Sequence, residues 1–589
     1  MTPIRMLRKA PRSITLVAVA VAVLAGGVSL AAALRGGGGS GEQVGHDSGS
    51  EAKEALSDHT VHHAPGDLRK VGAVDFPNSC DPAVQTEFRR GVALLHSFFY
   101  DEARKAFTAV TEQDPECAIG HWGIAMTWYH PVWAAPTDDE FSAGLAAVEA
   151  ARAAGPPTQR EQAYIAALAT FFCAPGTGGD SARESCPVGH AERAGRYREA
   201  MSGLHRDHPE DDEAAVFYAL ALLGSAPATD PTFANQVKAG EILGEVWRND
   251  QDHPGVVHYL IHAFDSPSLA DQGLAAAQAY ADIAPWVPHA LHMPSHTFTR
   301  LGRWEESIET NLDSAEAARA HMAEHHPGKA SFEELHALDY VVYAYLQTAR
   351  DDEAKNIVDR VAGMDQTHPE SDFVVAYAMG AIPARFALER GAWGEAASLP
   401  VPPRRLWAEF PFAEAHLEFA HALGRARTGD LSGTRLAIDR LKQLRDAVTG
   451  ARFEYFRKHV DVQIEAASGW LALAKGRHDE ALALLRRAAD ADDLLGKHPV
   501  SPGSIVPVRE LLGYALIEAR HPVEALEAYE ASLKLNRGRF AAVYGAGLAA
   551  ERAGNSDVAG RYYRELLQLS QSGGERAEVS HARAYLDKK

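Results

Sequence analysis

Residues 253–300, HPGVVHYLIHAFDSPSLADQGLAAAQAYADIAPWVPHALHMPSHTFTR, decide the fold. The stretch contains two histidine pairs with i, i+4 spacing, His258/His262 and His292/His296. Corresponding members of the two pairs are 34 residues apart. A fixed period of this length is typical of proteins built from stacked supersecondary units. We therefore expect the four imidazoles to occupy the same two positions on equivalent helices of neighbouring repeats.

The same period recurs elsewhere in the chain, in units at 84–117, 506–539 and 540–573. Each unit places small residues where two helices would approach closely and larger apolar residues along the helix interface. The matching residues are Gly91, Leu94, Ala103, Phe107, Val110 and Pro115, then Gly513, Leu516, Ala525, Tyr529 and Leu533, then Gly547, Ala559, Tyr563 and Leu566. This pattern resembles the tetratricopeptide-repeat superfamily over most of residues 84–573. The resemblance implies an all-α, right-handed superhelical solenoid of helix-turn-helix repeats that binds a protein or peptide in its concave groove.

Length and charge narrow the class of protein further. A single compact core does not normally accommodate 589 residues, which agrees with a solenoid. Lys and Arg number 58 against 79 Asp and Glu, a formal net charge of −21. Because no basic stripe offsets this charge, we expect no nucleic-acid partner.

The N-terminus predicts a membrane anchor. Arg5, Arg8, Lys9 and Arg12 precede the uncharged apolar run 14–34, which is long enough to span a bilayer of about 30 Å. The basic flank predicts that the rest of the chain lies outside the cytoplasm. We expect a signal anchor over 1–35, a flexible tether over 36–72 and the solenoid over 73–589, resembling membrane-anchored bacterial extracytoplasmic proteins of the same superfamily. Cleavage after Ala31-Ala32-Ala33 would instead give a secreted protein.

An extracytoplasmic location permits disulfides between the four cysteines. Cys173 and Cys186 enclose a Gly/Ser-rich loop that a bridge would stabilise. The pair Cys80–Cys117 then follows by elimination and would tie the segment before the first repeat to its neighbour.

Placing the histidines on the repeat gives a geometric hypothesis. With Ala276 at position 20 of its repeat, His258 falls at position 2, and His292 falls at position 2 of the next repeat. Taking Ala354 as position 20 of the repeat after that puts His336 at position 2 as well. Position 6 holds His262, then His296, then Tyr340. An alternative phasing through Ser307 moves the second pair to positions 5 and 9. On the first phasing, three successive inner helices present imidazoles on one face.

Imidazoles that converge from packed helices are typical ligands of a Cu, Zn or Fe ion. The predicted metal ligands are His258, His262, His292, His296 and His336. Additional groove residues, as ligands or partners that orient them, are His96, His121, His130, His253, Asp265, Asp339 and Tyr340. Two other interpretations stay open: histidines copied by repeat duplication that serve packing alone, and protonated histidines that contact an anionic ligand.

The sequence contains no phosphate loop, GxSxG elbow, HExxH motif or CxxC pair. The leading hypothesis is therefore a membrane-tethered extracytoplasmic scaffold that binds a partner. The alternative is a metal-dependent enzyme or metal-binding protein built on the histidine cluster. Interrupting loops such as Leu495–Val508 are expected to project over the inner face as lids or ligand contacts.

Overall fold

The computed structural model describes residues 70–132, 135–174, 189–227 and 230–588. All of them belong to one compact unit, His62–Lys589. Within these ranges, no helix is both long enough and apolar enough to cross a bilayer. The predicted membrane helix at 14–34, nearly all of the predicted tether, and Cys186 lie outside the described residues.

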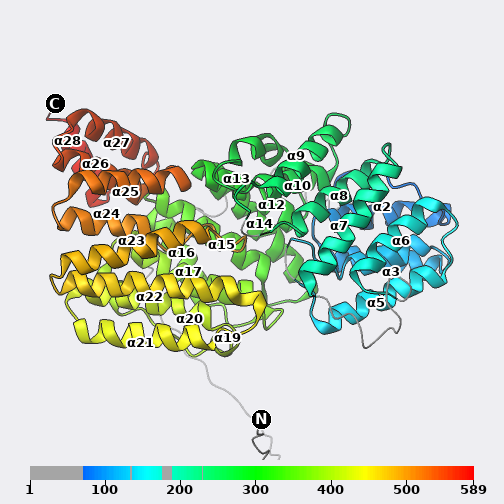
Figure 1. Cartoon of the computed structure of the whole chain (residues 1–589), viewed down its shortest axis with the longest axis horizontal. Coiled ribbons are helices and arrows are strands. Elements are labelled where there is room, and N and C mark those ends of the chain that lie inside the picture. Colours follow the sequence, from blue (N-terminus) through cyan, green and yellow to red (C-terminus); the bar gives the residue numbers. More distant parts are fainter. Residues whose placement is uncertain (1–69, 133–134, 175–188, 228–229, 589) are drawn as a thin grey trace, which may run out of the picture. The chain divides into compact units, whose positions relative to one another are not determined.

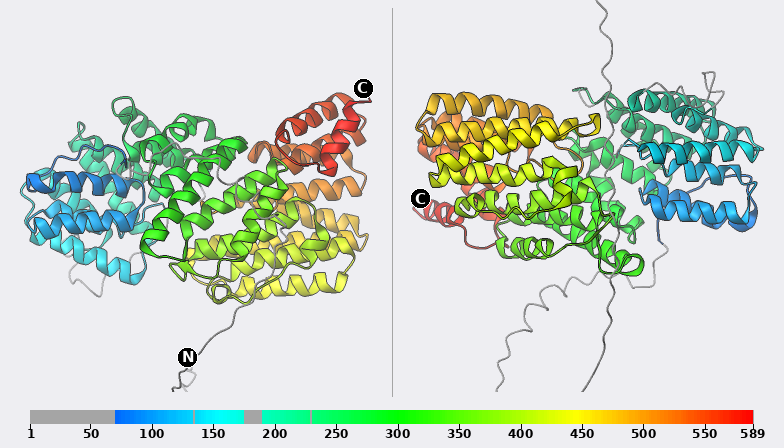
Figure 2. Two further views of the ribbon diagram at one scale, coloured as in Figure 1. Left: turned by 180° about the vertical axis from the view of Figure 1, so that it is seen from behind. Right: turned by 90° about the horizontal axis from the view of Figure 1, so that it is seen from below.

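The described chain is almost entirely helical, as the sequence predicts, and Figures 1 and 2 show its helices packed side by side in antiparallel pairs. The N-terminal helices are η1 Pro82–Val84, α2 Gln85–His96, α3 Tyr100–Gln113, α4 Ala118–Met126, α5 Asp138–Ala153, α6 Gln159–Phe171, α7 His190–Asp207, α8 Asp212–Gly224 and α9 Ala234–Trp247. The central elements are α10 Pro254–Phe264, η2 Ala270–Gly273, α11 Leu274–Ile283, α12 Pro288–His292, α13 Pro294–Leu301, α14 Trp304–His325, β1 Ala330–Ser331, α15 Phe332–Gln347, α16 Asp351–Ala362 and β2 Thr367–His368.

The C-terminal half continues the alternation of long paired helices. Its elements are α17 Phe373–Glu389, α18 Trp393–Ala397, α19 Arg405–Glu409, α20 Pro411–Thr428, α21 Leu431–Ala447, η3 Ala451–Phe453, α22 Glu454–Ala474, α23 His478–Leu495, α24 Val508–Glu518, α25 Pro522–Leu535, α26 Phe540–Arg552, α27 Ser556–Leu569 and α28 Ala577–Leu586. The two short strands, which the sequence did not predict, pair in parallel, with Ala330 opposite Thr367.

Glycine and an aromatic ring at fixed positions hold the repeat together. Gly91 on α2 faces the Phe107 ring on α3, and a Cβ added there would lie 2.9 Å from the ring. Gly123 on α4 packs against the same ring. Tyr529 on α25 lies in the same way between Gly513 on α24 and Gly545 on α26. These contacts confirm the predicted close approach of paired helices at small residues, because larger residues would separate the helices.

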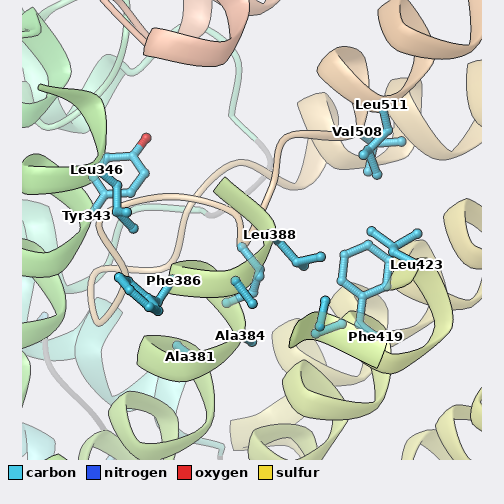
Figure 3. Close-up of a cluster of buried hydrophobic side chains, with 14 of the residues drawn as sticks. Tyr343, Leu346, Ala381, Ala384, Phe386, Leu388, Phe419, Leu423, Val508 and Leu511 are labelled. Atoms are coloured by element: carbon cyan, nitrogen blue, oxygen red, sulfur yellow. The ribbon is translucent and has the colours of Figure 1, made fainter. Parts of the chain in front are cut away.

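Two hydrophobic clusters fill the space between helices, one running from Val71 to Phe298 and the other from Trp304 to Ala582. Figure 3 shows part of the second cluster, to which α17 contributes Phe386 and Leu388, α20 contributes Phe419 and α24 contributes Leu511. The boundary between the clusters falls at the turn from α13 to α14. The predicted histidine site is on the helices on either side of this boundary.

A disulfide joins Cys80 to Cys117, with Cα atoms 4.8 Å apart. It ties the segment before α2 to the start of α4, which is the role that the sequence assigned to this pair. Cys173 lies in the described residues and Cys186 does not, so the bridge between them stays a prediction.

Candidate metal centre

Three inner helices carry the predicted ligands at equivalent positions. His258 is the fifth residue of α10, His292 the fifth of α12 and His336 the fifth of α15. Pro254 and Pro288 each occupy the first turn of their helix, where the missing N–H costs no hydrogen bond. The phasing through Ala276 is therefore the one that the helices follow. The second phasing, through Ser307, does not match these helix starts.

The first group of imidazoles consists of His258, His262 and His289, whose ligand atoms all lie within 4.8 Å of one another. His258 and His262 are one turn apart on α10, and their Nε2 atoms are 3.1 Å apart. His289 comes from the first turn of α12, and its ring centroid is 5.0 Å from that of His258. We call these three residues the first triad.

The second triad consists of His292, His296 and His336, which are all buried and meet the same 4.8 Å criterion. The Nε2 atoms of His292 and His296 are 3.1 Å apart, and the ring of His336 lies 4.2 Å from that of His292. Two ligands of one tetrahedral ion with metal–nitrogen bonds of about 2.0–2.1 Å are about 3.3 Å apart. The spacing within each pair therefore fits two nitrogens that share a metal ion.

The two triads are neighbours. The rings of His262 and His296 are 6.4 Å apart, and those of His289 and His292 are 6.2 Å apart. The sequence predicted one cluster centred on the four paired histidines. The structure instead divides the pairs between two triads, because His289 completes the first and His336 completes the second. Sequence reasoning missed His289, although its i, i+3 spacing to His292 in PHALH places both on one helix face.

Three of the imidazoles are held in place by hydrogen bonds from their Nδ1 atoms to oxygen acceptors. His258 Nδ1 donates to the backbone carbonyl of His96 at 2.6 Å. His292 Nδ1 donates to Asn311 Oδ1 at 2.7 Å, and the Asn311 amide nitrogen donates to the Ser307 carbonyl, which fixes the amide orientation. His296 Nδ1 donates to Asp265 Oδ2 at 2.8 Å. A hydrogen bond of this kind is the usual partner of a metal-binding imidazole.

These hydrogen bonds determine where the lone pairs are. With Nδ1 protonated, a neutral imidazole carries its lone pair on Nε2. The Nε2 lone pairs of His292 and His296 therefore face each other across 3.1 Å in a buried site. Such a contact is repulsive by itself and becomes favourable when both nitrogens bind one cation.

Burial keeps the six imidazoles neutral. It lowers the pKa of His262 to about 3 and that of His296 to about 4, with neighbouring positive charge adding to the effect. Burial also lowers the pKa of the other four members well below 6.5, and the adjacent imidazoles lower it further. Neutral imidazole is the form that binds metal, so the site needs no deprotonation at neutral pH.

Acidification should destabilise the metal-free protein from about pH 6.5 downward. Because each folded-state pKa is lower than the unfolded value of 6.5, the unfolded chain binds protons that the folded chain cannot. The stabilisation is complete above pH 6.5 and is lost as the pH falls toward 4 for His296 and toward 3 for His262. Each histidine contributes a slope of about 1.4 kcal/mol per pH unit in this window. Thermal unfolding at pH 7, 6 and 5 checks this, and an unchanged melting temperature would contradict it.

A cluster of three charged residues, Asp265, Lys497 and Arg300, lies beside the second triad. Asp265 accepts hydrogen bonds from Lys497 Nζ at 2.8 Å and Arg300 Nε at 2.9 Å, besides that from His296. Burial alone would raise the pKa of Asp265, but Lys497 and Arg300 outweigh it and hold that pKa well below 3.8. Burial lowers the pKa of Lys497 to about 8.

Lys497 lies in the loop between α23 and α24, which the sequence predicts to cover the inner face. Its ammonium lies 3.3 Å from His296 Nδ1 and 3.4 Å from the Tyr340 hydroxyl. Tyr340, which stands where the other two helices have a second histidine, donates to the Ser501 carbonyl of the same loop. Nothing in the sequence near Lys497 indicates this contact, because Asp265 is 232 residues away.

The remaining predicted residues surround the triads or lie apart from them. His253 caps α10, and with His96 it holds the buried carboxylate of Glu213, at 3.2 and 2.9 Å. Asp339 pairs with Arg385 in the core and is not grouped with either triad. His121 on α4 and His130 after it belong to neither triad; His130 packs against the Tyr100 ring. His96 and His130, both predicted to lie in the groove, do not meet in one site: His96 contacts Glu213 and His130 packs against Tyr100.

Comparison with known proteins adds little to this geometry. No protein-family model and no curated protein matches the chain. Among solved structures, yeast Tom70 is 10% identical with a TM-score of 0.31, covering 86% of this chain and 96% of that one. A chain of the APC/C hetero-tetramer Cut9-Hcn1 is 12% identical with a TM-score of 0.27, covering 85% of this chain and 95% of that one. A chain of the Naa15/Naa10 complex bound to HypK-THB is 13% identical with a TM-score of 0.22, covering 86% of this chain and 73% of that one. At these TM-scores the likenesses support no statement about ligand or activity.

Proposed function

We propose that this protein holds two transition-metal ions side by side, one in each histidine triad. The observation that carries the proposal is the orientation of His292 and His296. Their Nδ1 atoms are committed to Asn311 and Asp265, so two fixed Nε2 lone pairs face each other at 3.1 Å. A packing role does not account for this contact, because two neutral imidazoles would turn to form a hydrogen bond instead.

Histidine ligands allow Cu, Zn or Fe, and the lack of an uncompensated negative charge around the triads favours copper among these three metals. All six ligands are neutral imidazoles, and the nearby Asp265 is already balanced by Lys497 and Arg300. Two divalent ions would therefore add four uncompensated positive charges to a buried site, whereas two Cu(I) ions add two. Imidazole is a good copper ligand, and copper is the most tightly bound divalent ion of the first row.

An ion with three protein ligands keeps a further coordination position open. Two such copper ions side by side can exchange two electrons with one bound molecule, since each changes its charge by one. We therefore infer that the protein performs redox chemistry at a copper pair, with the solenoid as a rigid scaffold.

Metal analysis of the purified full chain tests the proposal. After anaerobic reconstitution with Cu(I), we expect two ions in the triads and a stabilisation of about 2.7 kcal/mol per ion at a free copper concentration of about 100 Kd. After oxidation, the electron paramagnetic resonance signal should account for much less than the copper in the triads, because adjacent Cu(II) ions couple. Triads that bind no copper and give no rise in melting temperature would refute the proposal. A full paramagnetic signal would refute the pairing.

A second candidate function, partner binding, keeps one supporting observation. A cavity of about 420 Å³ in the C-terminal repeats is lined by Trp393, Trp470, Tyr514 and Tyr544 among others. Aromatic-lined hollows of this size suit apolar side chains of a peptide. A bound peptide should change the tryptophan fluorescence of the protein, and Tyr514→Ala should weaken that response. Attachment to a membrane outside the cytoplasm remains a prediction from the N-terminal sequence.

A further inference from the structure

A cavity of about 820 Å³ lies beside the α2–α3 turn and the C-terminal end of α14. Five imidazoles and five carboxylates line it, against two permanently charged cations, Arg104 and Lys105. None of the six triad histidines lines the cavity. Its lining favours cations over anions and offers nitrogen and oxygen ligands.

Three of the lining residues have the spacing of a metal site. Glu102, His321 and His325 each offer one ligand atom, and these atoms lie within 4.8 Å of one another. His321 and His325 are one turn apart on α14, with stacked rings 4.2 Å apart. His325 Nδ1 lies 2.9 Å from the His321 carbonyl, which fixes that ring and leaves Nε2 for a ligand. Lys105 holds one carboxylate oxygen of Glu102 at 2.6 Å and so keeps the carboxylate at the cavity wall.

The Nδ1 atom of His321 is buried and has no hydrogen-bond partner among the described residues. A buried nitrogen without a partner is costly, and such groups in native structures usually mark a water, an ion or a functional role. A metal ion that His321 binds through Nδ1, together with Glu102 and His325, would satisfy it.

Two consecutive phenylalanines separate this cluster from the first triad. The ring of Phe99 lies 5.1 Å from that of His321. The ring of Phe98 lies 4.4 Å from that of His258 and 5.7 Å from that of His289, and Phe98 also lines the cavity. Phe98 adopts a left-handed backbone conformation (φ 54°), which is unfavourable for an aromatic residue and is typical of positions held for function. One aromatic layer thus lies between the cavity and the buried imidazoles.

We propose that Glu102, His321 and His325 form a third, solvent-accessible metal site that receives a copper ion and passes it to the triads. That Glu102, His321 and His325 bind a metal ion is argued from the geometry of the cavity alone. That this ion is then delivered to the triads rests on the proposed function. Two imidazoles and one carboxylate at an open cavity should hold copper less tightly than three largely buried imidazoles, which suits a site that must release its ion. The Phe98–Phe99 layer is the barrier that the ion crosses.

The experiment compares the full-length protein with the double variant His321→Ala/His325→Ala, with copper alone as the ligand. His521→Ala is the matched control, since His521 is an exposed histidine paired with a glutamate, Glu524, at 3.0 Å. Wild type and control should bind three copper ions, one of which a chelator removes at least 10-fold faster than the others. The double variant should bind two, and its triads should fill at least 10-fold more slowly. Metal-free melting temperatures confirm that all three proteins are folded.

Each other outcome has a distinct meaning. If the double variant binds as many ions as wild type, the third site is wrong. If it loses one ion but its triads fill at the wild-type rate, delivery is wrong. If wild type binds one ion and the double variant none, the third site stands and the proposed copper pair fails. Glu102→Gln should weaken only the fast-exchanging ion, and equal retention of that ion would exclude Glu102 as a ligand.

Discussion

Replacing His289 with alanine should remove one of the two buried copper ions and leave the other in place. Each ion depends on three imidazoles, and His289 belongs to the first triad only. His336→Ala should do the same at the second triad. Loss of a direct ligand should weaken binding by more than the roughly 10–100-fold typical of an outer-shell change. Copper content after dialysis against a competing chelator measures the effect.

These two variants also separate the paired centre from a single four-histidine centre. A centre made of His258, His262, His292 and His296 would bind one ion and would lose nothing in either variant. His459→Ala is the control, because His459 is buried on α22 with its pKa lowered by burial to about 4, yet belongs to neither triad. It should keep both buried ions. Retention of two buried ions by His289→Ala would contradict the assignment of the first triad.

The repeat pattern was enough to predict which helices meet at the site. The 34-residue spacing put His258 and His292 on equivalent turns, and aligning the following repeat on Ala354 added His336 and Tyr340. All three histidines are the fifth residue of their helix. This works because stacked helix pairs of equal length place equivalent residues of successive helices side by side, and the glycine–aromatic packing keeps the helices close.

The division into two triads could not be predicted from the repeat period, because it depends on residues that do not recur at equivalent positions of the other repeats. His289 has no counterpart on α10 or α15 at the same helix position, where those helices carry Gly255 and Glu333. Asn311, which accepts the hydrogen bond from His292, lies on α14. Lys497, which lies beside His296, belongs to a loop more than 200 residues further along the chain. These additions also weigh against simple copying of a packing histidine, since a duplicated residue would keep the same partner and His258 and His292 have different ones.

Asp265→Asn should have the largest effect on stability near the centre, with a loss of about 3–5 kcal/mol in the metal-free protein. Asp265 is 12% exposed and accepts hydrogen bonds from Lys497, Arg300 and His296. The amide removes the negative charge that balances Lys497 and Arg300, so the folded protein either holds two largely buried cations without a counter-charge or loses the Lys497 proton. Urea unfolding of the metal-free proteins at pH 7.5 measures the loss.

The same change should weaken the second triad selectively. His296 exchanges its charged carboxylate acceptor for a neutral amide oxygen, which makes the imidazole a weaker ligand, so copper affinity there should fall roughly 10–100-fold while the first triad keeps its affinity. The double variant Asp265→Asn/Lys497→Met separates the two effects. Methionine removes one uncompensated cation, so part of the lost stability should return, giving a coupling energy of at least about 1 kcal/mol. The copper affinity of the second triad should not recover, because His296 still lacks its carboxylate. Recovery of both would show that Asp265 acts only by balancing Lys497.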